Sequence, residues 1–166
     1  MDFMFQEYAR SEHPLDIIER LAAFQDWTFS RAETDEMSIS VSGRWADYDI
    51  ALTWIEDVEA LHIACAFHLK VPQLRRAEVL NLIARINEQL WVGHFDLWNN
   101  ENAVIHRQAL VLAGGAKPTQ SQCETMVNVA IETCERHFQA FQFVVWAGQT
   151  AREALDGVLF STEGMA

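Results

Sequence analysis

Four histidines lie on predicted strands: His62, His68, His94 and His106. Imidazole and carboxylate groups are common ligands of Zn²⁺ and related ions. Asp96 follows His94 by two residues on the same strand face, so both side chains could reach one ion. His62 and His68 also share a face, but strand geometry separates them by about 20 Å. The sequence therefore offers half of a metal site, and histidines held by ordinary hydrogen bonds are the simpler interpretation.

Sequence motifs of other catalytic or nucleotide-binding sites do not occur in the chain. Gly114-Gly115 precedes a predicted helix, but neither GxGxxG nor GxxxxGK[ST] is present. No GxSxG motif surrounds a serine. Cys65, Cys123 and Cys134 lack CxxC spacing, which favours reduced thiols packed in a core and a cytoplasmic protein. We therefore expect a protein that is not an enzyme and that uses no cofactor.

The aromatic residues point to binding instead, because six tryptophans are more than a small core normally needs. On the predicted C-terminal long helix, Phe143 and Trp146 extend the apolar surface beyond a single stripe. A helix that is apolar on more than one side is buried on more than one side, either by a second layer of the domain or by another subunit. Since aromatic residues often anchor interfaces, we predict that Trp98, Phe143 and Trp146 contribute to a protein-binding surface or a homodimer.

Composition limits the kinds of partner. The 166 residues carry a formal charge of −12, which argues against binding to nucleic acid or to an anionic membrane surface. A partner with a basic patch, or solubility alone, fits this charge better. The N-terminal stretch does not resemble a signal peptide, and the longest late uncharged run, 137–151, is shorter than the roughly 20 apolar residues of a membrane span.

The periodicity of apolar residues predicts the elements that position these side chains. Helices are expected from Pro14 to before Trp27, over 72–90, from about Thr119 to Gly148, and from Thr150 to about Leu159. Strands are expected at 27–33, 37–44, 47–56, 59–69, 94–98 and 103–112. Thr119 with Gln122, or Ser121 with Glu124, gives a capping-box pattern at the start of the long helix, and Thr150 with Glu153 gives another before the last helix. Blocks of strands separated by helices indicate a single α+β domain with an antiparallel sheet and flanking helices.

Two surfaces of these elements have open interpretations. One face of the sheet carries small residues: Ser38, Ser40, Ala51, Thr53, Ala64 and Ala66. This face is either exposed to solvent or packed closely against another part of the structure or a partner. The helix over 72–90 has an apolar stripe formed by Val79, Ile83, Ile86 and Leu90, which Leu80, Ala84 and Trp91 widen. The strand at 94–98 places His94, Asp96 and Trp98 on one side and Phe95 and Leu97 on the other.

Four stretches resemble the YbjN family of bacterial proteins: GRWADYDIALTW, IACAFHLKVP, LIARINEQLWVGHFDLW and CERHFQAFQFVVWAGQTAREAL. The resemblance covers about residues 13–160, and NEQLWVGHFDLW is among its most specific parts. It implies a fold similar to type III secretion chaperones, in the order α-β-β-β-α-β-β-α, and a role as a sensory-transduction regulator. It transfers no catalytic or binding residue, and a shared fold does not by itself carry function.

Taken together, these patterns predict one domain over residues 1–166 that acts as a non-enzymatic, chaperone-like or adaptor-like module. We expect a homodimer that binds a partner protein of unknown identity, with no role for nucleic acid or membrane. The alternative is a regulator that responds to a small molecule or a metal through His94 and Asp96.

Overall fold

The computed structural model describes residues 10–163, with side chains up to residue 159. In chain order the elements are α1 (Pro14–Phe24), β1 (Thr28–Glu33), β2 (Glu36–Ser42), β3 (Asp47–Ile55), the 3-10 turn η1 (Glu56–Val58), β4 (Ala60–Lys70), the 3-10 turn η2 (Gln73–Arg75), α2 (Arg76–Asn87), β5 (His94–Trp98), β6 (Ala103–Val111), α3 (Gln120–Val145) and α4 (Ala151–Glu163). This is the predicted α+β arrangement. The order implied by the family resemblance is extended by β1 and α4, both of which the residue patterns predict.

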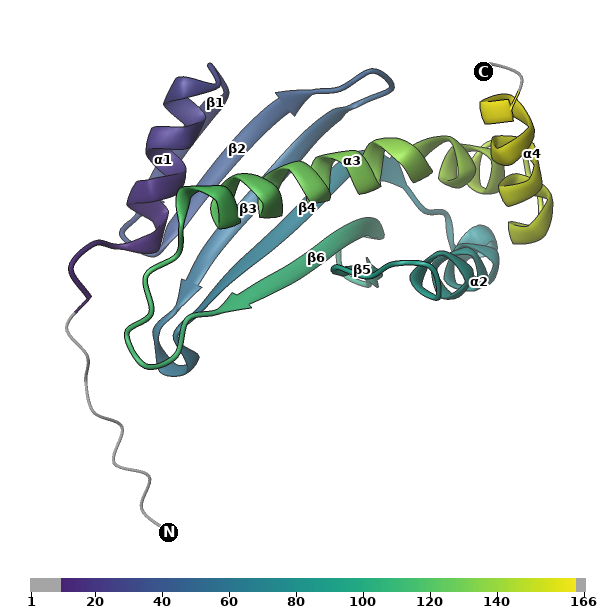
Figure 1. The fold of residues 1–166 in the computed structure, drawn as a ribbon. Helices are drawn as coiled ribbons and strands as arrows, with labels where there is room; N and C mark the ends of the chain where they lie inside the picture. Colours follow the sequence, from purple (N-terminus) through teal and green to yellow (C-terminus); the bar gives the residue numbers. More distant parts are fainter. Residues whose placement is uncertain (1–9, 164–166) are drawn as a thin grey trace, which may run out of the picture.

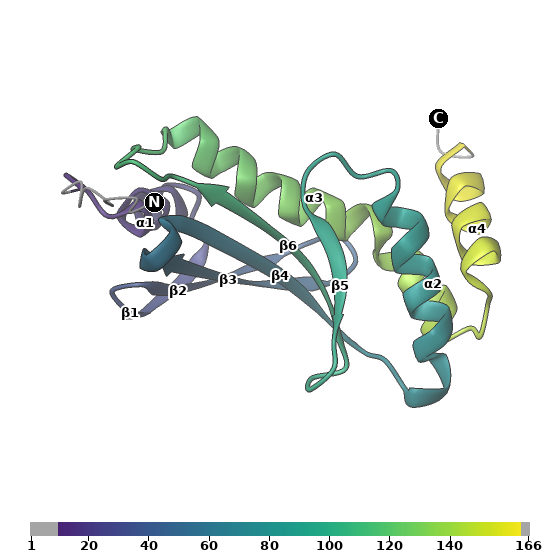
Figure 2. The same cartoon turned by 90° about the horizontal axis from the view of Figure 1, so that it is seen from below.

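The six strands form one antiparallel sheet in the order β1-β2-β3-β4-β6-β5. Helices α1 and α3 pack on one face of this sheet, and α2 and α4 pack together beside β5 at one end (Figures 1 and 2). No helix among residues 10–163 covers the opposite face. Of the small residues predicted on that face, Ser38, Ser40 and Ala51 are exposed, whereas Thr53 and Ala66 are half-buried and Ala64 is buried. The face is therefore open to solvent towards β2 and more enclosed along β4.

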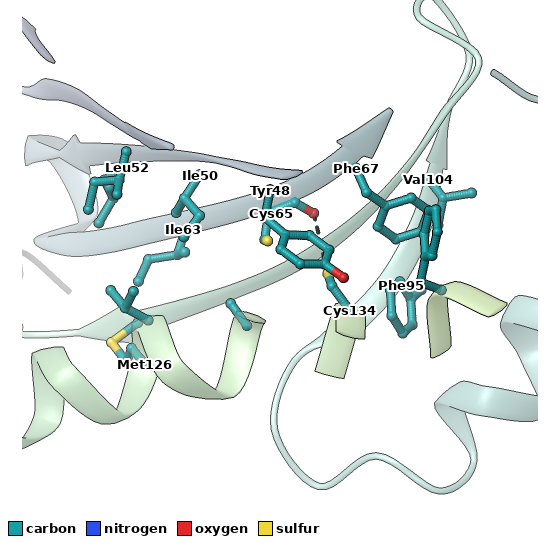
Figure 3. Packing of buried hydrophobic residues seen from close by; sticks show 14 of the residues in the cluster. Tyr48, Ile50, Leu52, Ile63, Cys65, Phe67, Phe95, Val104, Met126 and Cys134 are labelled. Carbon is teal, nitrogen blue, oxygen red and sulfur yellow. Dashed lines mark hydrogen bonds between the residues drawn. The ribbon is translucent and has the colours of Figure 1, made fainter. Parts of the chain in front are cut away.

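The core lies between the sheet and α3. Burial alternates along β2 and β3, whereas β4 is buried along most of its length. Ile39 of β2 lies opposite Ile50 of β3, which in turn lies opposite Cys65 of β4. Within this core, the ring of Phe67 (Figure 3) packs against aromatic rings carried by α3. The three cysteines are free and fully buried, as predicted, and burial raises the pKa of the Cys123 thiol to about 11.

Of the two capping boxes predicted as alternatives for α3, the structure has Thr119 with Gln122 and not Ser121 with Glu124, and the one predicted before α4 is present. At the start of α3, the Thr119 hydroxyl accepts from the Gln122 N–H at 3.0 Å, and the Gln122 side chain accepts from the Thr119 N–H at 2.8 Å. Thr150 and Glu153 exchange the same pair of bonds before α4. These side chains satisfy backbone donors that no helical carbonyl can reach, so the sequence fixes where each helix begins.

The predicted helix over 72–90 is wrong at both ends. It begins with a separate 3-10 turn, and α2 ends at Asn87. Trp91 therefore lies beyond the helix, where it is 100% exposed instead of widening the apolar stripe. Leu80 is also exposed, and Leu82 is buried in its place because α2 packs against α3 and α4 as well as β5.

Candidate interaction surface

The stretch from Asn87 to Trp98 joins α2 to β5 and forms the outer edge of the sheet. The Asn87 side chain donates to the Phe95 carbonyl at 3.1 Å and accepts from the Phe95 N–H at 2.8 Å. Gly93, at a φ of +69°, turns the chain between them, and an added Cβ would lie 2.6 Å from the His106 ring. Only glycine fits both the positive φ and this close approach.

Along β5 the side chains alternate as predicted. Phe95 and Leu97 are buried, and His94, Asp96 and Trp98 lie on the open face of the sheet. In this structure the Asp96 carboxylate has partners other than His94. One of its carboxylate oxygens accepts from the Leu97 N–H at 2.9 Å, and the other lies 3.9 Å from Nη1 of Arg107. Within residues 10–163, no three His, Cys, Asp or Glu side chains form a group that could hold a metal ion.

His94 instead lies beside two other basic side chains. It is directly opposite Arg107 in the β5–β6 register, and Arg107 Nε donates to Nε2 of His62 at 3.1 Å. Burial lowers the pKa of His62, and the charges of Arg107 and His94 lower it further. His62 therefore accepts this bond as a neutral ring with its proton on Nδ1.

These three side chains border a hollow of about 490 Å³, which we call the Trp91 hollow; its other lining residues are Trp91, Val92, Gly93, Gln108 and Ala109. The Arg107 side chain is 37% exposed. A second hollow, of about 590 Å³, continues from Arg107 towards Asp96, Trp98 and the hairpin residues 99–101. The outer face of β5 and β6 is thus hollowed along much of its length.

On the core side of the same strands, two histidines surround Phe95. The rings of His106 and His137 meet its ring edge-on, with centroids at 5.3 and 5.6 Å. His106 is fully buried, and neither ring nitrogen makes a hydrogen bond of good geometry among the described residues. Burial lowers its pKa to about 4, although the nearby Val92 backbone partly opposes this effect. Burial also lowers the pKa of His137, whose Nδ1 lies 2.8 Å from the Thr133 carbonyl.

A further polar cluster has no signal in the sequence. Glu135 of α3 accepts hydrogen bonds from the Tyr48 hydroxyl, the Arg44 N–H at 2.6 Å and the Trp45 N–H at 3.2 Å. Burial and the bond to Glu135 raise the pKa of Tyr48. Gly43 lies against both side chains, so this turn has no room for a Cβ. The cluster fixes the β2–β3 turn against α3, which is a structural role.

The aromatic residues predicted to bind a partner have different environments. Trp146 follows α3 and is 65% exposed. Phe143 is half-buried, and α4 lies over it near Gly157, so part of the extra apolar surface of α3 is covered within the chain. Trp98 is half-buried before the β5–β6 hairpin.

Two adjacent arginines, Arg75 and Arg76, bond to the segment that flanks Trp146 and to the residue that follows Trp98. Arg75 donates to the Val144 carbonyl at 2.8 Å and to the Gln149 carbonyl at 2.6 Å, which holds η2 against the α3–α4 link. Arg76 donates to the Asn99 side chain, next to Trp98. Leu74, which precedes this pair, is 93% exposed. We use the name apolar end for the three apolar side chains on these connected segments, Leu74, Trp98 and Trp146.

None of the helices described is long and apolar enough to cross a membrane. No curated protein sequence matches the chain. Among solved structures, a crystal structure of YbjN from E. coli, described as "a putative transcription regulator", shares the fold with a TM-score of 0.52 at 12% identity, over 73% of this chain and 85% of that one. A family model described as "Putative bacterial sensory transduction regulator" matches residues 14–143. Since this match spans most of the sequence, the chain belongs to the YbjN family.

Proposed function

We propose that this protein is a non-enzymatic protein-interaction module with an adaptor-like or chaperone-like role in bacterial regulation, and that it works as one domain in the cytoplasm. The observation that carries the proposal is the apolar end. There, Leu74 and Trp146 are largely exposed on segments that Arg75 holds together. Large apolar side chains on a rigid backbone lose little entropy on binding, so they make effective interface anchors.

The occupant that we propose for the apolar end is a second copy of this chain. A twofold axis through this end would place Trp146 of each copy near the same residue of the other, which makes the surface complementary to itself. Burying the tryptophan and leucine side chains there would stabilise the dimer by roughly 25 cal/mol for each Å² of apolar area removed from water. The open face of the sheet would then remain free to hold a segment of a partner protein.

Native mass spectrometry of the chain purified gently from its own host tests the proposal. A homodimer is the expected result, and a monomer bound to a different protein would overturn the second copy as the occupant of the apolar end. Leu74→Glu and Trp146→Glu should convert that species to a free monomer, because each change buries a charge in the interface. Val58→Glu is the matched control, since Val58 is 57% exposed in η1. A monomer without any bound protein would overturn the proposal.

The alternative function, a small-molecule-responsive regulator, is favoured by the Trp91 hollow. Its lining residues are not those of the apolar end, so the two functions can be tested with different substitutions. A metal-responsive regulator has less support, because Asp96 bonds the Leu97 N–H and lies near Arg107 instead of joining His94.

A further inference from the structure

The Trp91 hollow combines positive charge with an exposed aromatic ring. The register places His94 opposite Arg107, and the bond from Arg107 Nε to His62 brings the third basic side chain to the same face. Arg107 thus places a positive charge between two imidazole rings on a chain whose formal charge is −12, and His62 meets it as a neutral ring. An anion in the hollow would be attracted to Arg107, whose ion-pair partner Asp96 lies 3.9 Å away and on its other side.

The guanidinium of Arg107 is only partly used by the protein. Nε donates to His62, which orients the plane of the group. Asp96 lies on the other side, but the distance of 3.9 Å to Nη1 is too long for a hydrogen bond. Among the side chains described, which extend to residue 159, the Nη atoms make no hydrogen bond, so both remain available as donors on a guanidinium that lines the hollow. A carboxylate accepts two parallel bonds from such a pair.

Trp91 supplies the other half of the site. The α2 helix ends at Asn87, and the Gly93 turn, packed on His106, leads directly into β5. This junction leaves the Trp91 side chain entirely exposed at the border of the hollow, with Val92 half-exposed next to it. An indole ring presents a flat apolar surface, which suits an aromatic or apolar group carried by the same ligand.

We propose that the Trp91 hollow binds a carboxylate carried beside an aromatic or apolar group, with Arg107 and His94 contacting the carboxylate and Trp91 packing on the apolar part. The source of this chemistry is either a free aromatic acid or an acidic side chain next to an aromatic one in a protein segment. The site is separate from the apolar end, so it does not depend on the homodimer.

The test is an NMR titration of the ¹⁵N-labelled full chain with 3-phenylpropionate, with its neutral amide, 3-phenylpropionamide, and with inorganic phosphate. The carboxylate should shift the resonances of Trp91, Gly93, His94 and Arg107, with the millimolar affinity expected of a ligand of this size. The amide should cause no saturable shift. Equal binding of carboxylate and amide, or phosphate binding as tight as that of phenylpropionate, would overturn the proposal.

Variants make the test specific. Arg107→Gln should weaken phenylpropionate binding about tenfold, since a bidentate charged contact is lost. Trp91→Ala should weaken it roughly threefold through lost packing. Asp96→Asn should instead tighten binding, because it removes a competing negative charge near Arg107 while an amide oxygen can still accept from the Leu97 N–H. Arg85→Gln, an exposed arginine of α2, is the control that should change nothing. Unchanged affinity in Arg107→Gln would also overturn the proposal.

Two capped dipeptides distinguish the sources. Acetyl-Glu-Trp-amide should bind more tightly than acetyl-Gln-Trp-amide in either case. If it also binds more tightly than phenylpropionate, the ligand is a protein segment, and the reverse order identifies a free acid. Native mass spectrometry of Arg107→Gln should show the same assembly as the unchanged chain. The proposed ligand site and the proposed dimer interface can therefore be disproved independently of each other.

Discussion

Glu135 joins the β2–β3 turn to α3 through three donors: the Tyr48 hydroxyl and the backbone N–H groups of Arg44 and Trp45. Sequence reasoning missed this contact, because Tyr48 and Glu135 are separated by 87 positions and neither belongs to a motif. A glutamate on a helix is usually a solvated residue. Only the packing of α3 against the sheet reveals that this one satisfies three polar groups.

Replacing Glu135 should therefore lower the free energy of unfolding far more than replacing a neighbouring acidic residue. Glu135→Ala should lower the free energy of unfolding by about 2–4 kcal/mol, since it leaves a largely buried hydroxyl and two N–H groups without their acceptor. Urea denaturation followed by circular dichroism measures the loss. Glu132→Ala, an exposed glutamate one turn earlier on α3, should change stability by less than about 0.5 kcal/mol. Equal effects of the two substitutions would contradict the role of Glu135.

His106 should make the fold sensitive to acid. Its pKa is lowered to about 4, so it stays neutral in the folded protein while the unfolded chain, with a value near 6.5, takes up a proton. Stability should therefore fall as the pH drops from about 6.5 to about 4, by roughly 3 kcal/mol from this residue alone. Because the pKa of His137 is also lowered, it adds to the loss in the same direction.

Denaturation curves between pH 7 and pH 4 test this effect. His106→Leu should remove a large part of the pH dependence and keep the contribution of His137. His68→Gln, at a side chain that is mostly exposed beside Asp49, is the control and should retain the full dependence. A His106→Leu protein that loses stability as steeply as the unchanged chain would count against the buried neutral state.

At the scale of elements, local chemistry was predictable and contacts between elements were not. Thr119 and Thr150 define the starts of α3 and α4 because each capping box lies within four consecutive residues. Period-two alternation likewise identifies all six strands. The end of α2 was misplaced because Leu90 and Trp91 continue an apolar period. The side chain of Asn87 ends the helix by bonding to β5, which no local pattern shows.

Asn87 also closes the free edge of the sheet at β5, where unpaired backbone groups would otherwise invite another strand. Asn87→Ala should speed hydrogen exchange of the Phe95 amide about tenfold or more, because that N–H loses its acceptor. It should also lower the free energy of unfolding by about 1–3 kcal/mol. Asn81→Ala, at an exposed position of α2, is the control and should leave Phe95 exchange unchanged. If the Phe95 amide stays protected in Asn87→Ala, the bond does not close the edge.

At the scale of the whole molecule, the sheet is packed on one face only. Helices α1 and α3 cover one side, while α2 and α4 extend the structure beyond β5 (Figure 2). Of the residues predicted to bind a partner, Trp146 is exposed and Trp98 is half-buried, whereas Phe143 is partly covered by α4. The sequence identified the surplus of apolar helix surface, but it could not show that α4 folds back over part of it.

Arg75 is the residue on which the shape of this end depends. Its guanidinium bonds two carbonyls on either side of Trp146, and the neighbouring Glu78 side chain accepts from the Ala151 N–H at 2.9 Å. Arg75→Gln should lower the free energy of unfolding by about 2 kcal/mol, since charged hydrogen bonds are among the stronger ones. Hydrogen exchange should accelerate in α4 and leave β2 and β3 unaffected, because the bonds lie only at the helical end.

The same substitution connects the architecture to the proposed dimer. Arg75→Gln keeps Leu74 and Trp146 but releases the segments that carry them, so their apolar surfaces no longer have a fixed relative position. Native mass spectrometry should then show a weaker dimer, whereas Arg85→Gln should leave it intact. If Arg75→Gln loosens α4 without weakening the dimer, then the two copies must meet elsewhere, and the open face of the sheet becomes the next surface to substitute.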